Sequence, residues 1–107
     1  MGEPGNRWKV IYKITFPNGK IYVGQDRTDN LLYMGSVNRA LVDEDFPPDD
    51  REARRDYLLR KEILWESDSA TDSELTAREV ELIRETRSND PTIGYNRWPP
   101  FRPASAD

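Results

Sequence analysis

The stretch from Trp8 to Gln25 constrains the fold of this chain more than any other segment. It reads WKVIYKITFPNGKIYVGQ, and aromatic and β-branched residues fill both of its arms. Such residues favour a pleated, half-buried surface. Between the arms stands Pro17-Asn18-Gly19, which is one of the strongest local signals for a tight β-hairpin. The sequence therefore predicts two antiparallel strands joined by a short turn.

The length of that turn decides whether Tyr12 and Tyr22 lie on the same face of the hairpin. A two-residue Asn-Gly turn pairs positions whose numbers sum to 37, which places the two tyrosines on opposite faces. A three-residue loop that begins at Pro17 and ends with a left-handed Gly19 pairs positions that sum to 36, and both tyrosines then share a face. Proline favours the second alternative because its ring pre-sets φ for the second position of a turn.

Three helices are predicted after the hairpin. The first runs over 37–44 with Ser36 as its N-cap, and the second is a short helix over 51–55. The third runs over 72–87 and begins with a capping box, in which Thr71 is followed by a glutamate three residues later.

Residues 57–66, YLLRKEILWE, are predicted to form a third strand. Lys61, Ile63 and Trp65 alternate with their neighbours at the period of a strand. A helix is the alternative here, because leucine, arginine, lysine and glutamate favour it intrinsically. We expect one domain over 1–107, with a flexible lead-in at 1–7 and an irregular, proline-containing tail at 98–107.

Composition excludes several kinds of site. The 107 residues include no cysteine and no histidine, so disulfides, thiolate metal sites and a Ser-His-Asp triad are ruled out. No apolar run approaches the ~20 residues that a membrane span needs, so the expected location is the cytoplasm. The net charge of −4 argues mildly against nucleic-acid binding. Residues 1–40, however, carry six basic and three acidic side chains, which leaves room for a positive face near the hairpin.

The order of the motifs resembles the GIY-YIG nuclease domain. Ile11-Tyr12 is followed by Asn18-Gly19-Lys20 and then by Tyr22-Val23-Gly24, and a later helix carries Glu79. Gly94-Tyr95-Asn96 is similar to the closing motif of that family. The resemblance covers almost the whole chain, and the ordered set at these spacings is far more specific than any one piece.

One position departs from the family pattern, because Val10 stands where the first motif has glycine. Tyr12 is retained, so the departure affects packing near that strand more than the chemistry. The resemblance implies a mixed α/β fold of the α+β class. A small antiparallel three-stranded sheet in it is flanked by helices. It also implies a strand rather than a helix at 57–66.

The activity implied by the resemblance is that of a metal-dependent endonuclease that hydrolyses DNA phosphodiester bonds. Tyr12 would activate the attacking water and Tyr22 would orient it, or the reverse. A tyrosine has an ordinary pKa of about 10, so it acts as a base only where nearby positive charge lowers that value. Lys20, two residues from Tyr22 and on the same face, could supply that charge, as could the arginine or the metal. Asn96 would support the site by hydrogen bonding; the alternative is that it is only a turn residue.

An arginine is needed to bind the scissile phosphate, because its guanidinium can bond two phosphate oxygens at once. Arg39 is the only basic residue of the helix predicted over 37–44 and is the first candidate. Arg27 in the loop after the hairpin is an alternative, as are Arg54 and Arg55. Each of these could equally be a solvated surface side chain.

Glu79 is the expected ligand for a divalent cation, Mg²⁺ or Mn²⁺. Helical spacing places it on the apolar stripe of its helix, four residues after Leu75 and three before Leu82. An unpaired carboxylate on an inward face is costly, and metal ligation would explain it, because Mg²⁺ accepts one or two carboxylates with water and phosphate oxygens. The structural alternative pairs Glu79 with an arginine or a tyrosine hydroxyl.

DNA is the expected partner, and the chain carries no recognisable DNA-reading motif beyond the domain itself. Sequence specificity is therefore either slight or supplied by a partner protein or a second copy in a homodimer. Two other functions remain open from the sequence. One is a catalytically silent module that binds nucleic acid or protein with the same fold, and the other is an inhibitor or scaffold that uses the acidic surface.

Overall fold

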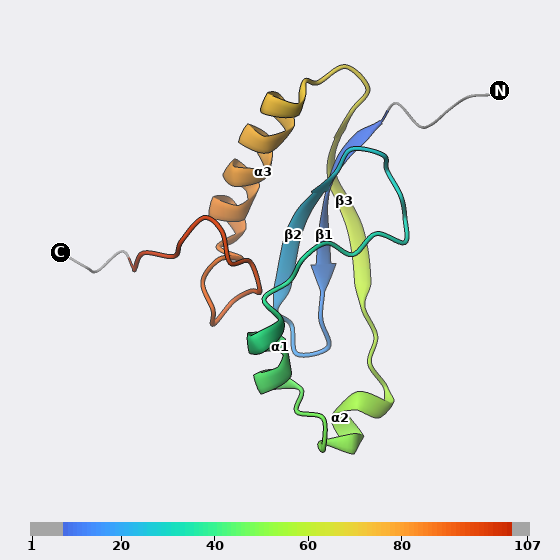
Figure 1. The fold of residues 1–107 in the computed structure, drawn as a ribbon, viewed down its shortest axis with the longest axis vertical. Coiled ribbons are helices and arrows are strands. Elements are labelled where there is room, and N and C mark those ends of the chain that lie inside the picture. Colours follow the sequence, from blue (N-terminus) through green and yellow to red (C-terminus); the bar gives the residue numbers. More distant parts are fainter. Residues whose placement is uncertain (1–7, 104–107) are drawn as a thin grey trace.

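A computed structural model describes residues 8–103, which form one sheet and three helices (Figure 1). The strands β1 (Lys9–Thr15), β2 (Ile21–Asp26) and β3 (Arg60–Ser67) are antiparallel and lie in the order β2-β1-β3. The helices are α1 (Arg39–Asp45), α2 (Arg51–Arg55) and α3 (Asp72–Thr86). The predicted α+β class with a three-stranded antiparallel sheet is confirmed.

The chain outside these elements has little regular structure. Residues 98–103 form neither helix nor strand, while 1–7 and 104–107 lie outside the described residues. Within 8–103, no helix combines the length and the apolar character that crossing a membrane requires.

The hairpin has the three-residue loop. Ile14 lies opposite Tyr22 in the ladder, so paired positions sum to 36. The N–H of Phe16 donates to the carbonyl of Lys20 at 2.9 Å, and Gly19 adopts a φ of +88°. That positive φ suits glycine, which lacks the Cβ that would clash there. Tyr12 and Tyr22 consequently lie on one face of the sheet, as predicted.

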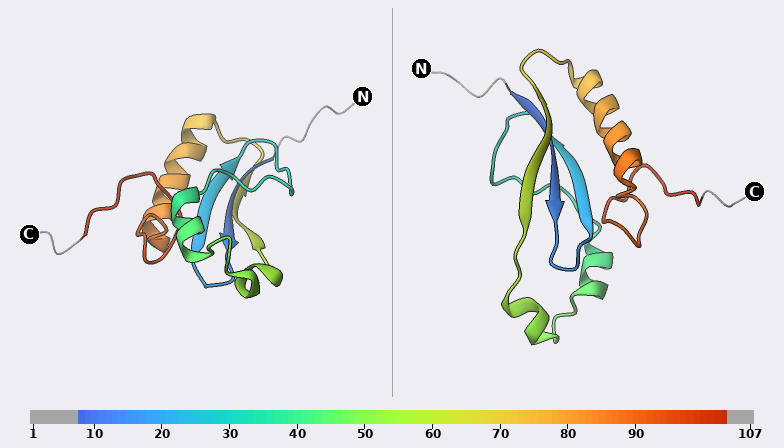
Figure 2. Two further views of the ribbon diagram at one scale, coloured as in Figure 1. Left: turned by 60° about the horizontal axis from the view of Figure 1, so that its bottom comes forward. Right: turned by 180° about the vertical axis from the view of Figure 1, so that it is seen from behind.

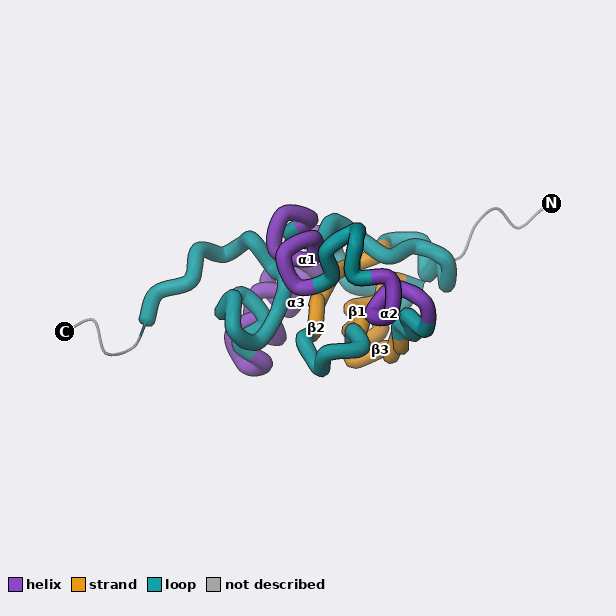
Figure 3. Tube along the Cα trace, turned by 90° about the horizontal axis from the view of Figure 1, so that it is seen from below, coloured by secondary structure: helices purple, strands orange, loops and turns teal. Residues whose placement is uncertain are grey.

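The two faces of the sheet bury separate apolar clusters. The first face, here called the tyrosine face, packs against α1, α2 and the residues that follow them. Its buried members are Val10, Tyr12, Ile14, Phe16, Tyr22, Phe46 and Tyr95. The second face packs against α3, and its buried members are Ile11, Val23, Leu75, Leu82 and Ile83. Seen along the strands, α1 and α3 lie on different sides of the sheet (Figure 3).

A bulge interrupts the alternation predicted for 57–66. The strand assignment itself is confirmed, although β3 begins at Arg60 rather than at residue 57. Tyr12 lies opposite Ile63 and its neighbour Ile11 lies opposite Trp65, so β3 has one extra residue between them. Strict alternation would put Lys61 and Trp65 on one face. The bulge instead leaves Lys61 on the tyrosine face, while Trp65 packs beneath α3.

The N-terminus of α1 differs from the prediction. The helix begins at Arg39, and Asn38 is its N-cap, with a side-chain oxygen that accepts from the N–H of Leu41 at 3.3 Å. The predicted N-cap at Ser36 is therefore wrong. Asparagine caps helices as well as serine does, and the N–H of Ser36 instead donates to the hydroxyl of Tyr22 at 3.0 Å.

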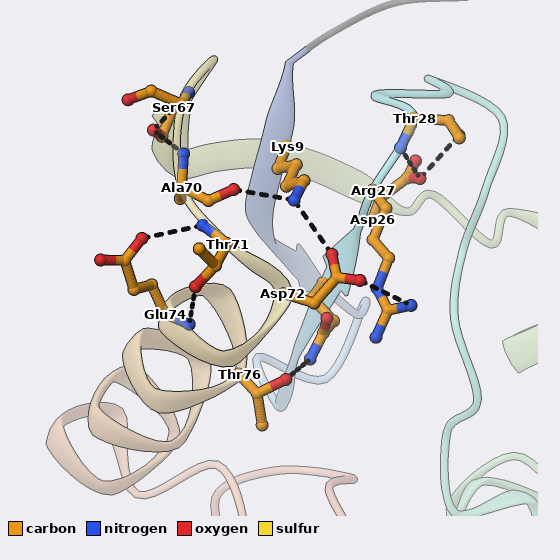
Figure 4. Close-up of polar contacts among 12 residues, drawn as sticks. Lys9, Asp26, Arg27, Thr28, Ser67, Ala70, Thr71, Asp72, Glu74 and Thr76 are labelled. Atoms are coloured by element: carbon orange, nitrogen blue, oxygen red, sulfur yellow. Dashed lines mark hydrogen bonds and ion pairs between the residues drawn. The ribbon is translucent and has the colours of Figure 1, made fainter.

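The predicted capping box at the start of α3 is confirmed. The hydroxyl of Thr71 accepts from the N–H of Glu74 at 3.1 Å, and the carboxylate of Glu74 accepts from the N–H of Thr71 at 2.8 Å (Figure 4). Lys9 on β1 ties this end of the helix to the sheet, because its Nζ donates to Asp72 at 3.0 Å and to the carbonyl of Ala70 at 2.7 Å.

Candidate functional site

The two tyrosines of the hairpin meet close to two glycines. Their ring centroids are 6.3 Å apart, with the planes tilted by 47°. A Cβ added to Gly24 would lie 2.5 Å from the hydroxyl oxygen of Tyr12, and one added to Gly35 would lie 2.8 Å from the hydroxyl oxygen of Tyr22. The Cβ at Gly35 would also clash with the Tyr12 hydroxyl. Both hydroxyls therefore occupy the space that the missing side chains of these glycines leave.

Glu79 approaches the tyrosines from the helix that packs on the other face. In both views of the ribbon, α3 runs beside β2, which is an edge strand (Figures 1 and 2). The Nε2 of Gln25 on β2 donates to Oε1 of Glu79 at 2.9 Å. Burial raises the pKa of both Tyr12 and Tyr22, and the negative charge of Glu79 raises both further. The charge of Glu79 thus contributes to the raised pKa of both tyrosines, although for Tyr12 it is the smallest of the causes.

Among residues 8–103, the carboxylate of Glu79 has no cationic partner to offset its burial. Burial raises its pKa, and the hydrogen bonds from Gln25 oppose that shift only in part. The structural alternative, in which an arginine neutralises Glu79, is not realised among residues 8–103. An inward-facing carboxylate with only an amide partner keeps oxygen lone pairs available for another ligand.

The tyrosine pair is covered in this conformation. The side chain of Tyr12 has an exposed fraction of 0% and that of Tyr22 of 8%. The Tyr22 hydroxyl accepts from the N–H of Ser36, whereas the Tyr12 hydroxyl is buried without a hydrogen-bond partner in the described chain. The ring of Tyr33 meets that of Tyr12 edge-on, at a centroid distance of 6.2 Å. Water reaches the Tyr12 hydroxyl only if the covering segment moves.

That covering segment is the connection between β2 and α1, residues 27–38, which crosses the tyrosine face as far as β3 and returns (Figure 1). Lys61 on β3 holds it in place. Its Nζ donates to the carbonyls of Asn30, Leu31 and Tyr33 at 3.0, 3.3 and 2.8 Å, and it lies 4.5 Å from the ring centroid of Tyr12. The side chains of Leu31 and Leu32 point outward, with exposed fractions of 70% and 85%.

Two exposed arginines line a hollow beside Tyr22. This hollow of about 580 Å³ is formed by residues 35–40 together with Arg97. Arg39 and Arg97 have no hydrogen-bond or ion-pair partner within residues 8–103. The backbone of Ser36, which bonds the Tyr22 hydroxyl, also lines the hollow. The structure thus places Arg39 in a hollow that Ser36 connects to Tyr22, and no described residue engages its donors.

The other candidate arginines are engaged elsewhere or lie apart. Arg27 pairs with Asp72 at 3.4 Å and is drawn toward the start of α3 (Figure 4). Arg54 donates through Nε and Nη2 to the carbonyl of Phe46, at 2.9 and 2.6 Å. Arg55 is exposed at the last residue of α2. None of the three lines the hollow beside Tyr22.

Arg97 was not among the predicted site residues. It follows Asn96 directly, so the signal available in the sequence was its place next to the closing motif. Burial raises the pKa of Tyr22, and the positive charge of Arg97 acts in the opposite direction. Arg97 thus opposes the shift in part, but the pKa of Tyr22 remains raised, so the lowering expected from a nearby positive charge is not seen.

Lys20 lies at the turn end of the hairpin, where it pairs with Asp45 at 2.7 Å. The hydroxyl of Tyr95 also donates to Asp45, at 2.7 Å, and accepts from the side-chain amide of Asn18 at 2.9 Å. This network joins the turn, the end of α1 and the closing segment. The charge of Lys20 is thereby taken up by Asp45 and does not act as the expected neighbour of Tyr22.

Asn96 binds the backbone of β2 beside the site. Its side-chain oxygen accepts from the N–H of Val23 at 2.9 Å, and its amide nitrogen donates to the carbonyl of the same residue at 2.8 Å. Val23 immediately precedes Gly24, the glycine against which the Tyr12 hydroxyl packs. Asn96 therefore anchors β2 next to that contact. The supporting role expected of Asn96 agrees with this placement.

Glu79 is the carboxylate that the described residues offer to a divalent cation at the site. Residues 8–103 contain no cluster of three or more histidine, cysteine, aspartate or glutamate side chains. Glu79 stands alone, with one oxygen bonded to Gln25. A single carboxylate suits Mg²⁺, which keeps several waters and takes phosphate oxygens as further ligands. The donor set thus fits a cation that is completed by the substrate.

No family model matches the chain, and neither a curated protein nor a solved structure matches it. The resemblance to the GIY-YIG domain remains a prediction from the motifs.

Proposed function

We propose that this protein is a metal-dependent endonuclease that hydrolyses DNA phosphodiester bonds, with the GIY-YIG arrangement of its site. The observation that supports it best is the approach of three groups from separate elements: the hydroxyls of Tyr12 and Tyr22 lie together, and the charge of Glu79 acts on both. Titratable groups with shifted pKa values at one place are typical of catalytic sites.

Tyr22 is better suited than Tyr12 to take a proton from water. Burial and Glu79 leave its pKa raised overall, but the N–H of Ser36 donates to its oxygen and the positive charge of Arg97 also opposes the rise. Tyr12 has no such donor. In this proposal Tyr22 activates the water and Tyr12 orients it, while the opposite assignment expected from the motifs stays a prediction.

The scissile phosphate is proposed to sit in the hollow beside Tyr22. Arg39 and Arg97 line that hollow and have free donors, so they would bind the phosphate oxygens and stabilise the charge that gathers there. Glu79 would hold Mg²⁺ or Mn²⁺. When bound, such a cation supplies positive charge that polarises the phosphate and offsets the negative charge at the site.

The covered tyrosine pair favours a second candidate, a module that binds DNA without cleaving it. A plasmid-nicking assay with and without Mg²⁺ separates the two, and it should be repeated with Glu79→Gln and with the exposed Glu85→Gln on the same helix as a matched control. The proposal expects nicking that needs the cation, falls by on the order of 100-fold in Glu79→Gln and is unchanged in Glu85→Gln. Equal nicking by both variants would reject the metal assignment, and DNA binding with no nicking at any Mg²⁺ or Mn²⁺ concentration would select the silent module.

A further inference from the structure

A second pocket opens between α1 and α2, next to the hollow that holds Arg39 and Arg97. Its volume is about 450 Å³, which is within the usual range for small-ligand sites. The polar part of its lining consists of Arg39, Asp43, Arg51 and Arg54, and the apolar part of Val37, Val42, Phe46 and Tyr57. The proposed hydrolytic chemistry assigns no role to this pocket.

The pocket is positively charged on a protein whose net charge is −4. Three arginines and a single aspartate line it. Arg54 is fixed in place by the carbonyls of Phe46 and Pro47, and only its Nη2 approaches Asp43, at 3.7 Å. Within residues 8–103, Arg51 has one hydrogen bond, from Nη1 to the carbonyl of Pro48 at 2.8 Å. The guanidinium groups therefore keep N–H donors for an anion, and their planar forks match the geometry of a phosphate group.

The apolar part of the pocket suits a flat ring. The rings of Phe46 and Tyr57 meet edge-on, with centroids 5.0 Å apart, and Phe46 is buried. Aromatic side chains beside arginines are the usual means of holding an unpaired base together with its phosphate. The combined chemistry of the pocket is thus that of a nucleotide.

Arg39 and Val37 line both the α1–α2 pocket and the hollow beside Tyr22, so the two spaces adjoin. We infer that the α1–α2 pocket binds the nucleotide next to the scissile phosphate, with its base against Phe46 and Tyr57 and its phosphate on Arg39 and Arg51. This inference rests on the proposed nuclease function, because it places the pocket on the path of the cleaved strand.

The test is a titration of the ¹⁵N-labelled protein without metal, followed by NMR. Three probes are added separately: inorganic phosphate, thymidine 5′-monophosphate and a short single-stranded oligothymidylate. We expect signals of α1, α2 and Tyr57 to shift, with the monophosphate binding more tightly than inorganic phosphate. Equal affinity for the monophosphate and for inorganic phosphate would show that the base does not bind in the pocket, and would overturn the inference.

Arg51→Gln should weaken oligothymidylate binding by about tenfold, which is the effect of losing one charged hydrogen bond. It should also lower the slope of log affinity against log salt concentration by about 1. The exposed Arg84→Gln on α3 should leave both unchanged. Shifts confined to residues 35–40 and Arg97 would overturn the pocket assignment while leaving the nuclease proposal intact. Shifts at α1 and α2 together with no nicking would support the pocket and reject only the hydrolysis.

Discussion

The side-chain amide of Asn96 makes both of its hydrogen bonds to one residue, Val23. The N–H of Val23 donates to Oδ1 at 2.9 Å and its carbonyl accepts from Nδ2 at 2.8 Å. These bonds attach the segment after α3 to the free edge of β2. The N–H of Tyr95 adds a further bond to the same strand, because it donates to the carbonyl of Ile21, two residues before Val23. An edge strand has backbone groups without a ladder partner, and here a side chain supplies that partner.

Asn96→Ala is expected to lower the free energy of unfolding by about 2 kcal/mol, because two backbone groups of the buried Val23 lose their partners. Urea denaturation followed by circular dichroism measures the change. Asn96→Asp should be less stable than the parent at neutral pH, since its carboxylate would face the Val23 carbonyl, and should regain stability in acid once it can donate a proton. An Asn96→Ala protein as stable as the parent would show that these bonds contribute nothing to the fold.

Removing the buried hydroxyl of Tyr12 should stabilise the protein. That hydroxyl has no partner in the described chain, so its desolvation is uncompensated. We expect Tyr12→Phe to raise the free energy of unfolding by about 1 kcal/mol while nicking falls. Tyr22→Phe is the matched control, because it loses the bond from Ser36 and should be less stable by about 1 kcal/mol. A loss of stability in Tyr12→Phe would mean that the hydroxyl has a structural partner.

Gly35→Ala should be costlier than Gly19→Ala, although both glycines have positive φ, +75° and +88°. A Cβ at Gly19 meets nothing within 4 Å, so only backbone strain of about 1 kcal/mol is expected there. A Cβ at Gly35 would meet the hydroxyls of Tyr12 and Tyr22, which adds about 1–3 kcal/mol for overpacking. Comparison of the two thermal midpoints checks this. Similar thermal midpoints for Gly35→Ala and Gly19→Ala would contradict the prediction, because they would mean that the tyrosine hydroxyls lie farther from Gly35.

Asp45 is expected to make stability depend on pH in the acid range. Burial alone would raise the pKa of Asp45, but hydrogen bonds from Lys20 and Tyr95 outweigh it and hold the pKa below its usual value. A carboxyl whose folded-state pKa is lowered stabilises the protein above its unfolded pKa of about 3.9, and this contribution is lost as pH falls through the lower folded value.

Asp45→Asn should therefore be less stable than the parent at pH 7, by about 2 kcal/mol, and the difference should shrink as the pH is lowered toward 3. The exposed Asp43→Asn on the same helix is the control and should track the parent. Unfolding free energies measured in urea across this range provide the test, and a constant difference between parent and Asp45→Asn would contradict it.

Local chemistry was sufficient to predict the hairpin, the tyrosine face and the start of α3. Proline before Asn-Gly selected the three-residue loop, and that loop alone places Tyr12 and Tyr22 on one side. The capping box of Thr71 likewise located the start of α3. These features depend on neighbours within a few residues, which is why the sequence by itself determined them.

Tertiary structure decided the electrostatics of the site. The bulge in β3 keeps Lys61 above the Tyr12 ring, a long-range pairing holds Lys20 on Asp45, and the fold brings Arg97 to the hollow beside Tyr22. The position of residues 27–38 over the two tyrosines also could not be predicted from neighbouring residues in the sequence. Burial, charge pairing and strand register all depend on residues far apart in the chain, and only the packed structure brings them together.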